Sequence, residues 1–274
     1  MSRPAEKVSL LGTGATKYDD AEKSRLKKTV IRRRGYWHAF HQGLLDYSPA
    51  YLQAYLDFHE PPFTSGRLGE KLCEFIYIAV DAAVSHLFAP GAEMHIKKVL
   101  TLGASPEEVI EVIELAMMAA HSSHTAGLPI LVEELERAGL CSEELQRPLT
   151  PNETERKQRY IATTGSWPAG GDALFRFAPE FVEGFLAYGE IPFGSGPLPE
   201  RSKQLILISV YASPVAPQPG PLRQHIRRAL EVGVSPQEIS DAMQLSSGIA
   251  IHTCVAAIPM LVAAASQEAA KPPG

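Results

Sequence analysis

The sequence has few of the features that mark secreted, zinc-binding or nucleic-acid-binding proteins. Its 274 residues include only three cysteines, Cys73, Cys141 and Cys254, which are odd in number and widely separated. This spacing favours neither a disulfide framework nor a zinc site. The net charge of −5 gives no general attraction to nucleic acid or to anionic membranes. The N-terminus lacks the apolar core of a signal peptide and we expect no membrane span, so we predict a cytoplasmic protein.

The composition is that of a folded, soluble chain. Hydrophobic residues make up 45% and charged residues 21% of the sequence, which is ordinary for a protein with a substantial core. The length allows either one large domain or two small ones, and it does not decide between them.

An internal repeat indicates two related halves. When the sequence is aligned with itself, PPFTSGRLGEK (61–71) falls without a gap on IPFGSGPLPER (191–201), and the match continues at the same register through the following segments. Only two copies are present, which indicates a duplication and not a solenoid. The predicted organisation is a polar N-terminal arm (1–35), a first copy (36–140), a connector (141–158), a second copy (159–266) and a tail (267–274).

Each copy is predicted to be helical. Residues 65–87 contain no proline, and apolar residues recur there at helical spacing, which predicts one long helix. A second helix is expected over 93–103, where Gly103 suits a left-handed C-terminal cap. The third is expected to begin at Ser105, with Pro106 and Glu108 completing a capping box that returns at Ser235, Pro236 and Glu238. Pro129 and Pro259 are expected to kink or break this run, giving a short final helix from about 129 to 137 and its counterpart in the second copy.

One motif appears in both copies and carries a family resemblance. The segments HIKKVLTLGASPEEV (95–109) and HIRRALEVGVSPQEI (225–239) share the pattern H-I-[KR]-[KR]-x-L-x-x-G-[AV]-S-P-x-E-[VI]. With the long helix before it, this order resembles the carboxymuconolactone decarboxylase and alkylhydroperoxidase D superfamily. The resemblance implies an all-α fold of two tandem alkylhydroperoxidase D-like helical bundles. For two-copy chains it also implies a homotrimer that looks like a hexamer.

The chain departs from the redox members of that superfamily. Their Glu, C-x-x-C and His pattern requires a thiolate and a resolving thiol, and the corresponding stretches here contain no cysteine. The sequence is therefore more similar to the decarboxylase branch, which the resemblance implies works without a metal or an organic cofactor. Decarboxylation requires a group that orients the carboxylate, a hydrogen bond to the developing enolate and a proton for carbon, and histidine suits the last two tasks.

Histidines and glutamates at matching positions are the first candidates for catalysis. His95 and His225 start the shared motif, and the resemblance implies that a histidine there faces a pocket. A histidine that is merely hydrogen-bonded in the core is an equally good interpretation of the pattern. Glu70 and Glu200 also match each other and are predicted as acidic partners, although a glutamate in the first turn of a helix is also stabilised by the helix dipole.

The third helix of each copy carries polar clusters, AAHSSHTAG (119–127) and IAIHTCVAA (249–257), inside apolar stretches. Buried polar groups destabilise a fold unless they are hydrogen-bonded, so these clusters are candidates for a pocket lining. The two clusters differ in chemistry, which suggests one active and one degenerate pocket. From them we predict His252 as catalytic and His121, His124 and Cys254 as substrate-binding. His121 and His124 have the spacing of metal ligands on a helix, but no carboxylate accompanies them, and we predict no metal.

Three further residues complete the predicted substrate site. Ser85 and His86 lie at the end of the predicted long helix, where the C-x-x-C pair would lie, and their counterparts Val215 and Ala216 cannot play the same role. Arg223, beside His225, is predicted to bind a substrate carboxylate.

The sequence therefore predicts a cofactor-independent lyase that acts on a small carboxylated or lactone-type compound through histidine acid–base chemistry. Two alternatives are kept: a thiol-dependent peroxidase that uses a lone cysteine, and a non-catalytic binding or assembly protein of the same fold. The expected partner is a small-molecule substrate, with neither nucleic acid nor membrane.

Overall fold

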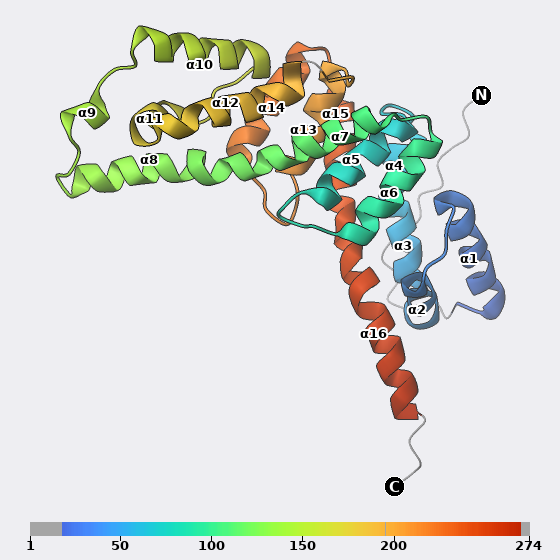
Figure 1. Ribbon diagram of the computed structural model, residues 1–274. Helices are drawn as coiled ribbons and strands as arrows, with labels where there is room; N and C mark the ends of the chain where they lie inside the picture. The colour runs from blue at the N-terminus through green and yellow to red at the C-terminus, as the bar shows by residue number, and fades with distance from the viewer. Residues whose placement is uncertain (1–17, 195, 270–274) are drawn as a thin grey trace. The chain divides into compact units, whose positions relative to one another are not determined.

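A computed structural model describes residues 18–194 and 196–269, and within these residues the protein contains helices and no strand (Figure 1). The helices are α1 (Asp20–Arg34), α2 (Ala39–Tyr47), α3 (Pro49–His59), α4 (Pro61–Thr64), α5 (Glu70–Ala82), α6 (Ala89–Thr101), α7 (Pro106–Met117), α8 (Ser122–Arg137), α9 (Glu143–Gln146), α10 (Pro151–Thr164), α11 (Gly171–Phe177), α12 (Pro179–Gly194), α13 (Glu200–Tyr211), α14 (Pro219–Glu231), α15 (Pro236–Gly248) and α16 (His252–Ala269), with 3₁₀ turns η1 (Met118–His121) and η2 (Ile249–Ile251). The predicted all-α class is confirmed.

The chain forms two compact units. The first combines residues 1–58 with 253–274, and the second is 59–252. In the first unit residues 20–34 of the predicted polar arm form α1, which begins at a capping box of Asp19 and Glu22 and buries Leu26 and Val30. Residues 1–17 of the predicted arm and residues 270–274 of the predicted tail lie outside the described residues.

The second unit is built on one hydrophobic core that the predicted copies share. Helices α5, α6 and α7 supply one set of buried residues and α13, α14 and α15 supply another, and α5 packs against α13. The middle of α5 is buried on all sides from Cys73 to Asp81, as is α13 from Lys203 to Tyr211. The matching order of the two sets supports the predicted duplication, which stays a prediction.

The predicted helix starts are confirmed. Ser105 and Ser235 each cap a helix through the backbone N–H of the glutamate three residues later, and each glutamate bonds back to the serine N–H. Gly103 has a φ of 83° and ends α6 in the left-handed conformation, where a side chain would be strained.

Two expectations about helix length were wrong. The long helix predicted over 65–87 is shorter, because Gly66 and Gly69 have positive φ before α5 and the chain leaves the helix at Ala83. Pro129 and Pro259 do not break their helices but lie inside α8 and α16. The break comes earlier, at the 3₁₀ turns η1 and η2, so that α8 and α16 begin before their prolines.

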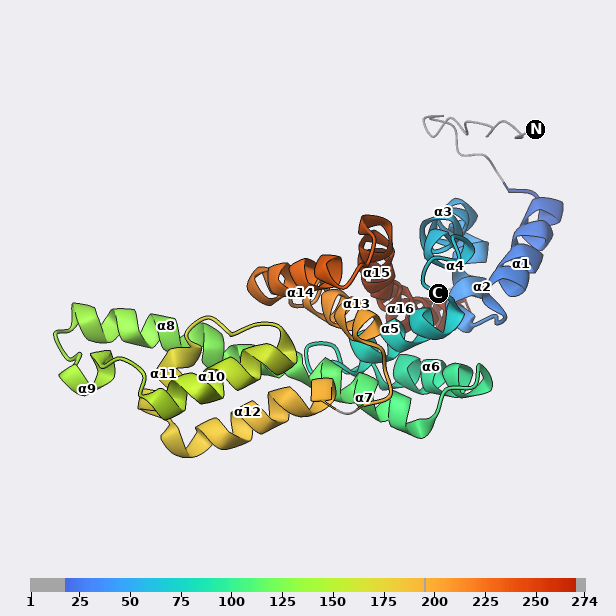
Figure 2. The ribbon, with the colours of Figure 1, turned by 90° about the horizontal axis from the view of Figure 1, so that it is seen from above.

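Helices α8, α10, α11 and α12 form a second, smaller hydrophobic core within the second unit. Figure 2 shows α10 alongside α12 there. Tyr160, Leu174, Phe185 and Leu186 are buried in this core, with Leu128 of α8 against them. The predicted connector 141–158 thus contains α9 and the first half of α10, which starts at a capping box of Thr150 and Glu153.

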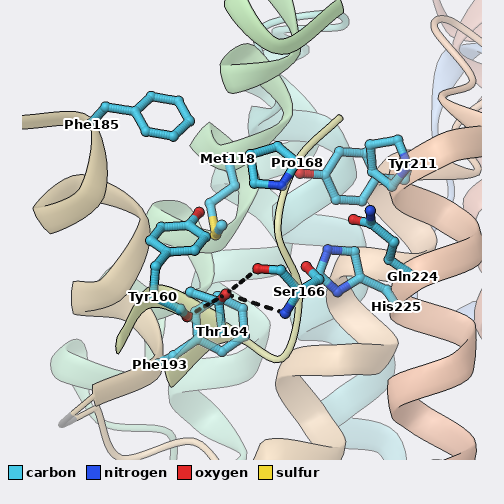
Figure 3. A pocket seen from close by; sticks show the side chains of 11 residues that line it. Met118, Tyr160, Thr164, Ser166, Pro168, Phe185, Phe193, Tyr211, Gln224 and His225 are labelled. Atoms are coloured by element: carbon cyan, nitrogen blue, oxygen red, sulfur yellow. Dashed lines mark hydrogen bonds between the residues drawn. The ribbon is translucent and has the colours of Figure 1, made fainter. Parts of the chain in front are cut away.

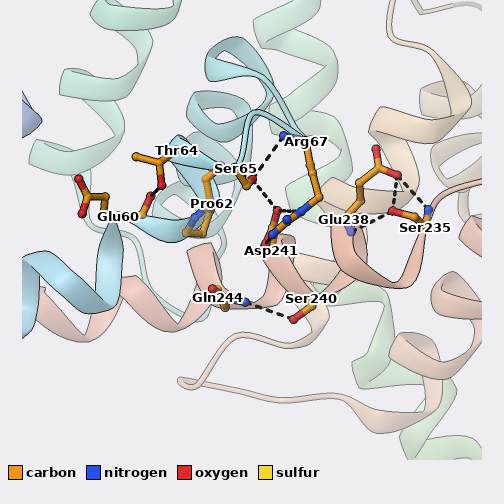
Figure 4. A network of polar contacts seen from close by, with 10 residues as sticks. All are labelled: Glu60, Pro62, Thr64, Ser65, Arg67, Ser235, Glu238, Ser240, Asp241 and Gln244. Atoms are coloured by element: carbon orange, nitrogen blue, oxygen red, sulfur yellow. Dashed lines mark hydrogen bonds and ion pairs between the residues drawn. The ribbon is translucent and has the colours of Figure 1, made fainter. Parts of the chain in front are cut away.

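Buried carboxylates hold the loops before α5 and α13 in place. Asp241 of α15 accepts hydrogen bonds from Arg67 at 2.6 and 2.7 Å and from Ser65 at 3.0 Å (Figure 4). Glu111 of α7 accepts one from the backbone N–H of Leu198 at 2.7 Å and pairs with Lys203 at 2.6 Å. Glu111 and Asp241 hold equivalent positions in the alignment of the two copies, so each predicted copy supplies the carboxylate that anchors the other's loop.

One run among the described residues, Pro236–Glu268, contains a stretch that by length and composition alone could cross a membrane, and little of that stretch is buried. Exposed apolar side chains on α16 include Met260 and Leu261.

Candidate active site

The packing of α6 on α5 creates the first candidate site. Helix α5 begins at Glu70, one turn before Glu74, and α6 carries His95 against the same face. His95 Nδ1–H donates a hydrogen bond to Glu74 Oε2 at 2.6 Å, and both side chains are buried. A hydrogen bond with an ionised partner is stronger than a neutral one and fixes the ring. It also leaves Nε2 as the nitrogen that faces away from Glu74.

Aromatic and histidine side chains surround this pair. The Tyr77 ring stacks on the His95 ring with centroids 4.6 Å apart. The Tyr77 hydroxyl lies 3.4 Å from His59 Nδ1. The Glu74 site, defined as Glu74, Tyr77, His95 and His59, therefore holds a positioned imidazole with a second hydroxyl–imidazole contact beside it.

The second helix set repeats the arrangement with an amide in place of the carboxylate. His225 Nδ1–H donates to Gln204 Oε1 at 2.9 Å, and the ring stacks on Tyr211 at 5.2 Å. Burial lowers the pKa of His225 to about 4, so this ring is neutral at pH 7. We call Gln204, Tyr211 and His225 the Gln204 site.

A small cavity opens at the Gln204 site. It has a volume of about 50 Å³, and His225, Tyr211, Gln224, Ser166 and Met118 are among its lining residues (Figure 3). Thr164 closes one side, where its hydroxyl donates to the Ser166 carbonyl at 3.0 Å. The cavity has room for a few water molecules or a very small ligand.

A third group of polar side chains lies close to the Glu74 site. Asp81, from the last turn of α5, is fully buried, and its carboxylate lies 3.9 Å from His86 Nε2 and 3.7 Å from His252 Nδ1. These two histidine nitrogens are 2.8 Å apart. Burial, with smaller contributions from the charges of His86 and His95, lowers the pKa of His252 to about 4, so His252 lies within electrostatic range of the Glu74 site.

Comparisons with known proteins identify the fold family. The family model described as "Carboxymuconolactone decarboxylase family" matches residues 49–131. A crystal structure from Burkholderia xenovorans LB400, of a protein provisionally described as a gamma-carboxymuconolactone decarboxylase subunit, is 30% identical, with a TM-score of 0.83 over 90% of this chain and 98% of that chain. The chain belongs to the carboxymuconolactone decarboxylase family. No curated protein matches it.

The structure places the predicted acidic residues of this family member differently from the sequence analysis. The partner of His95 is Glu74 and not Glu70, which instead pairs with Lys98 at 2.9 Å and is half exposed. Glu200 accepts hydrogen bonds from Gln204 at 3.0 Å and from Arg228 at 3.3 Å. Glu200 thus reaches the Gln204 site through the amide of Gln204, which itself is the partner of His225.

The other predicted binding residues are dispersed. Arg223 is exposed on α14 and is not among the residues that line the cavity beside His225. His124 stacks on Phe181 at 4.9 Å and lines a separate apolar cavity between α8 and α12. The side chain of His121 lies outside the described part of the structure. Ser85 is half-buried in the loop before His86.

Burial disfavours thiolate formation at two of the three cysteines, Cys73 and Cys254. All three are unpaired, and burial raises the pKa of Cys73 to about 12. Burial also raises the pKa of Cys254, which lies in the first unit. A raised pKa keeps a thiol protonated and removes the thiolate that attacks peroxides.

Sequence reasoning missed Glu74, Tyr77 and Asp81. Glu74 stands as far before His95 as Gln204 stands before His225, a signal that was passed over because the second copy has no acid there. Asp81 stands in the otherwise apolar run FIYIAVDAAV (75–84), where a buried carboxylate needs an explanation. Its contact with His252, from a distant part of the chain, follows only from the fold.

Proposed function

We propose that this protein is a decarboxylase-like lyase that works at the Glu74 site on a small carboxylated lactone. The observation that carries the proposal is the buried hydrogen bond of 2.6 Å between His95 and Glu74. The family membership and the description of the Burkholderia protein as a gamma-carboxymuconolactone decarboxylase subunit support the same reaction class.

The proposed chemistry uses groups of the chain itself. The bond between the carboxylate carbon and the ring carbon breaks, carbon dioxide leaves, and the electron pair moves into the conjugated carbonyl of the substrate. Glu74 accepts the hydrogen bond from Nδ1–H of His95 and holds the ring in place, so that Nε2–H of the imidazolium donates first a hydrogen bond to the enolate oxygen and then a proton to carbon. The Tyr77 ring fixes the plane of the imidazole.

The Gln204 site is proposed to be the degenerate one. A neutral glutamine accepts the same hydrogen bond, but it gives no charge that would stabilise an imidazolium, and burial lowers the pKa of His225. Predicted catalytic roles for Glu70, Glu200 and His225 gain no support from the contacts, whereas that of His95 does.

The experiment measures carbon dioxide release from γ-carboxymuconolactone by the purified protein and four variants. We expect His95→Asn to lower kcat by about 10²- to 10⁴-fold, the usual contribution of a general acid. Glu74→Gln copies the Gln204 site and is expected to lower kcat with little change in KM, because it acts through the charge of His95 and not on substrate binding.

Two variants are matched controls. Glu70→Gln removes an exposed carboxylate one turn earlier on α5, and His225→Asn alters the Gln204 site, and both should keep near-normal kcat. Absence of carbon dioxide release from the unmodified protein, or normal kcat in His95→Asn, would refute the proposal.

We also propose a cytoplasmic homotrimer. The Burkholderia protein is described as a subunit, and exposed apolar residues such as Met260 and Leu261 on α16 suit burial between copies of the chain. Light scattering should give three times the chain mass of 29.8 kDa, and a monomer mass would overturn the trimer.

A further inference from the structure

We propose that Asp81, His86 and His252 form a binding site for one divalent transition-metal ion. The sequence analysis predicted no metal, because no carboxylate accompanies the histidines at ligand spacing along the chain. The fold brings the missing carboxylate to two histidines from distant segments, and the three ligand atoms lie within 4.8 Å of one another.

The distances match those of ligands around a single ion. Two ligand atoms on a tetrahedral zinc ion, each about 2.0–2.1 Å from the metal, are about 3.3 Å apart. The three separations here, 2.8 Å between the histidine nitrogens and 3.7 and 3.9 Å from them to Asp81, lie on both sides of that value. An ion would require shifts of only a few tenths of an ångström, with the two rings moving apart and the carboxylate moving in.

Asp81 supplies a second and independent observation. Its side chain has no exposed surface, and neither carboxylate oxygen has a hydrogen-bond partner. A buried carboxylate without partners is costly, and nearly all such groups in proteins are paired, hydrogen-bonded or bound to metal. A cation between Asp81 and the two rings would satisfy these oxygens at once.

The backbone around the cluster is shaped to hold it. Leu87, the one described non-glycine residue with positive φ, adopts 48° directly after His86, a strained conformation of the kind found at functional sites. The Phe88 backbone N–H then donates to the Asp81 carbonyl at 2.8 Å and closes the loop. At Gly91 a Cβ atom would come within 2.1 Å of Asp81 Oδ2, so any larger residue would displace the Asp81 carboxylate.

The second helix set offers an internal comparison. In the alignment of the two copies Asp81 corresponds to Tyr211, His86 to Ala216 and Gly91 to Pro221. The loop closure is retained there, because the Gln218 backbone N–H donates to the Tyr211 carbonyl at 2.9 Å. The shared loop therefore does not require Asp81 and His86, and their presence in the first set alone points to a task beyond folding.

The ligand set favours zinc and its neighbours among the metals. Two imidazole nitrogens and one carboxylate oxygen suit zinc, cobalt or ferrous iron and disfavour calcium and magnesium, which prefer oxygen. Three protein ligands leave at least one position open for water or for a small anion. The inference does not rest on the proposed decarboxylase function, because the ligands are distinct from Glu74 and His95.

The test is metal binding by the full chain in the absence of substrate. The protein is stripped with a chelator and titrated with Co²⁺, followed by visible absorbance, and bound Zn²⁺ is then measured by equilibrium dialysis and elemental analysis. We expect one ion per chain and a Co²⁺ spectrum of a four- or five-coordinate site. Asp81→Asn and His252→Asn should each weaken binding by about 100-fold or more, exceeding the loss from removing an outer-shell partner.

His124→Asn is the matched control, because it removes an exposed histidine that stacks on Phe181 outside the cluster, and it should bind as the parent does. Asp81→Asn preserves the shape of the side chain, so if His252→Asn fails to fold, metal binding is compared between the parent protein and Asp81→Asn alone. Binding that is absent in the parent, or equal in the parent and Asp81→Asn, would overturn the proposal. A loss of carbon dioxide release with metal binding intact would count against the decarboxylase function alone.

Discussion

The buried ion pair between Lys203 and Glu111 allows a quantitative test of how the second unit is held together. Lys203 Nζ lies 2.6 Å from Glu111 Oε1 and donates to the Pro192 carbonyl at 2.7 Å. The two side chains are only 4% and 3% exposed, so water cannot replace either partner. Lys203→Met keeps the length of the side chain and leaves the Glu111 charge buried with the Leu198 N–H alone.

Removal of one partner from a buried pair typically costs about 3–5 kcal/mol, and we expect a loss of that size in the free energy of unfolding of Lys203→Met. The double variant Lys203→Met, Glu111→Gln removes both charges, and the amide oxygen can still accept from Leu198. It should be more stable than Lys203→Met alone, which gives a favourable coupling between the two positions.

The assay is chemical unfolding followed by far-UV circular dichroism. Glu93→Gln is the control, because Glu93 pairs with Lys97 on the surface, where an ion pair contributes less than about 1 kcal/mol. The buried pair does not stabilise the unit if Lys203→Met lowers the free energy of unfolding no more than Glu93→Gln does. The same conclusion follows if the double variant loses as much stability as Lys203→Met and Glu111→Gln lose separately when added together.

Two further predictions concern stability. The folded pKa of His225 is about 4 and its ordinary value is 6.5, so the unfolded chain binds the proton first as the pH falls. Stability should therefore decrease by about 3 kcal/mol between pH 6.5 and pH 4 through this residue. Unfolding curves of His225→Asn across that range should show a shallower decrease, and an identical decrease would contradict the assignment. Gly91→Ala should destabilise the protein by about 1–3 kcal/mol through its clash with Asp81, whereas Gly127→Ala, at an open position inside α8, should raise the melting temperature. Equal melting temperatures for the two alanine variants would contradict the close packing at Gly91.

Local signals in the sequence predicted the helix starts because capping is a short-range effect. Ser105 and Ser235 need only a proline and a glutamate within three residues, and the structure contains both boxes. The expected break at Pro129 was wrong, because this proline is the eighth residue of α8 and the chain leaves the preceding helix earlier, at η1.

The site was harder to predict because it depends on which face of a helix is covered. Glu70 and Glu74 lie one turn apart on α5, and the sequence favoured the one with a matching twin. Only the packing of α6 shows that Glu74 meets His95 while Glu70 turns to Lys98. No local pattern could bring together Asp81 and His252, because their contact depends on η2 packing against α5.

The carboxylates of Asp241 and Glu111 have a consequence for the integrity of the chain. Asp241 anchors the loop that leads to Glu74, and Glu111 anchors the loop that leads to Gln204. The loop before the histidine site of each half is thus held by a carboxylate from the other half. A protein severed within the connector would yield two fragments, each incomplete alone and complementary together, and their reunion would order both histidine sites in a single step.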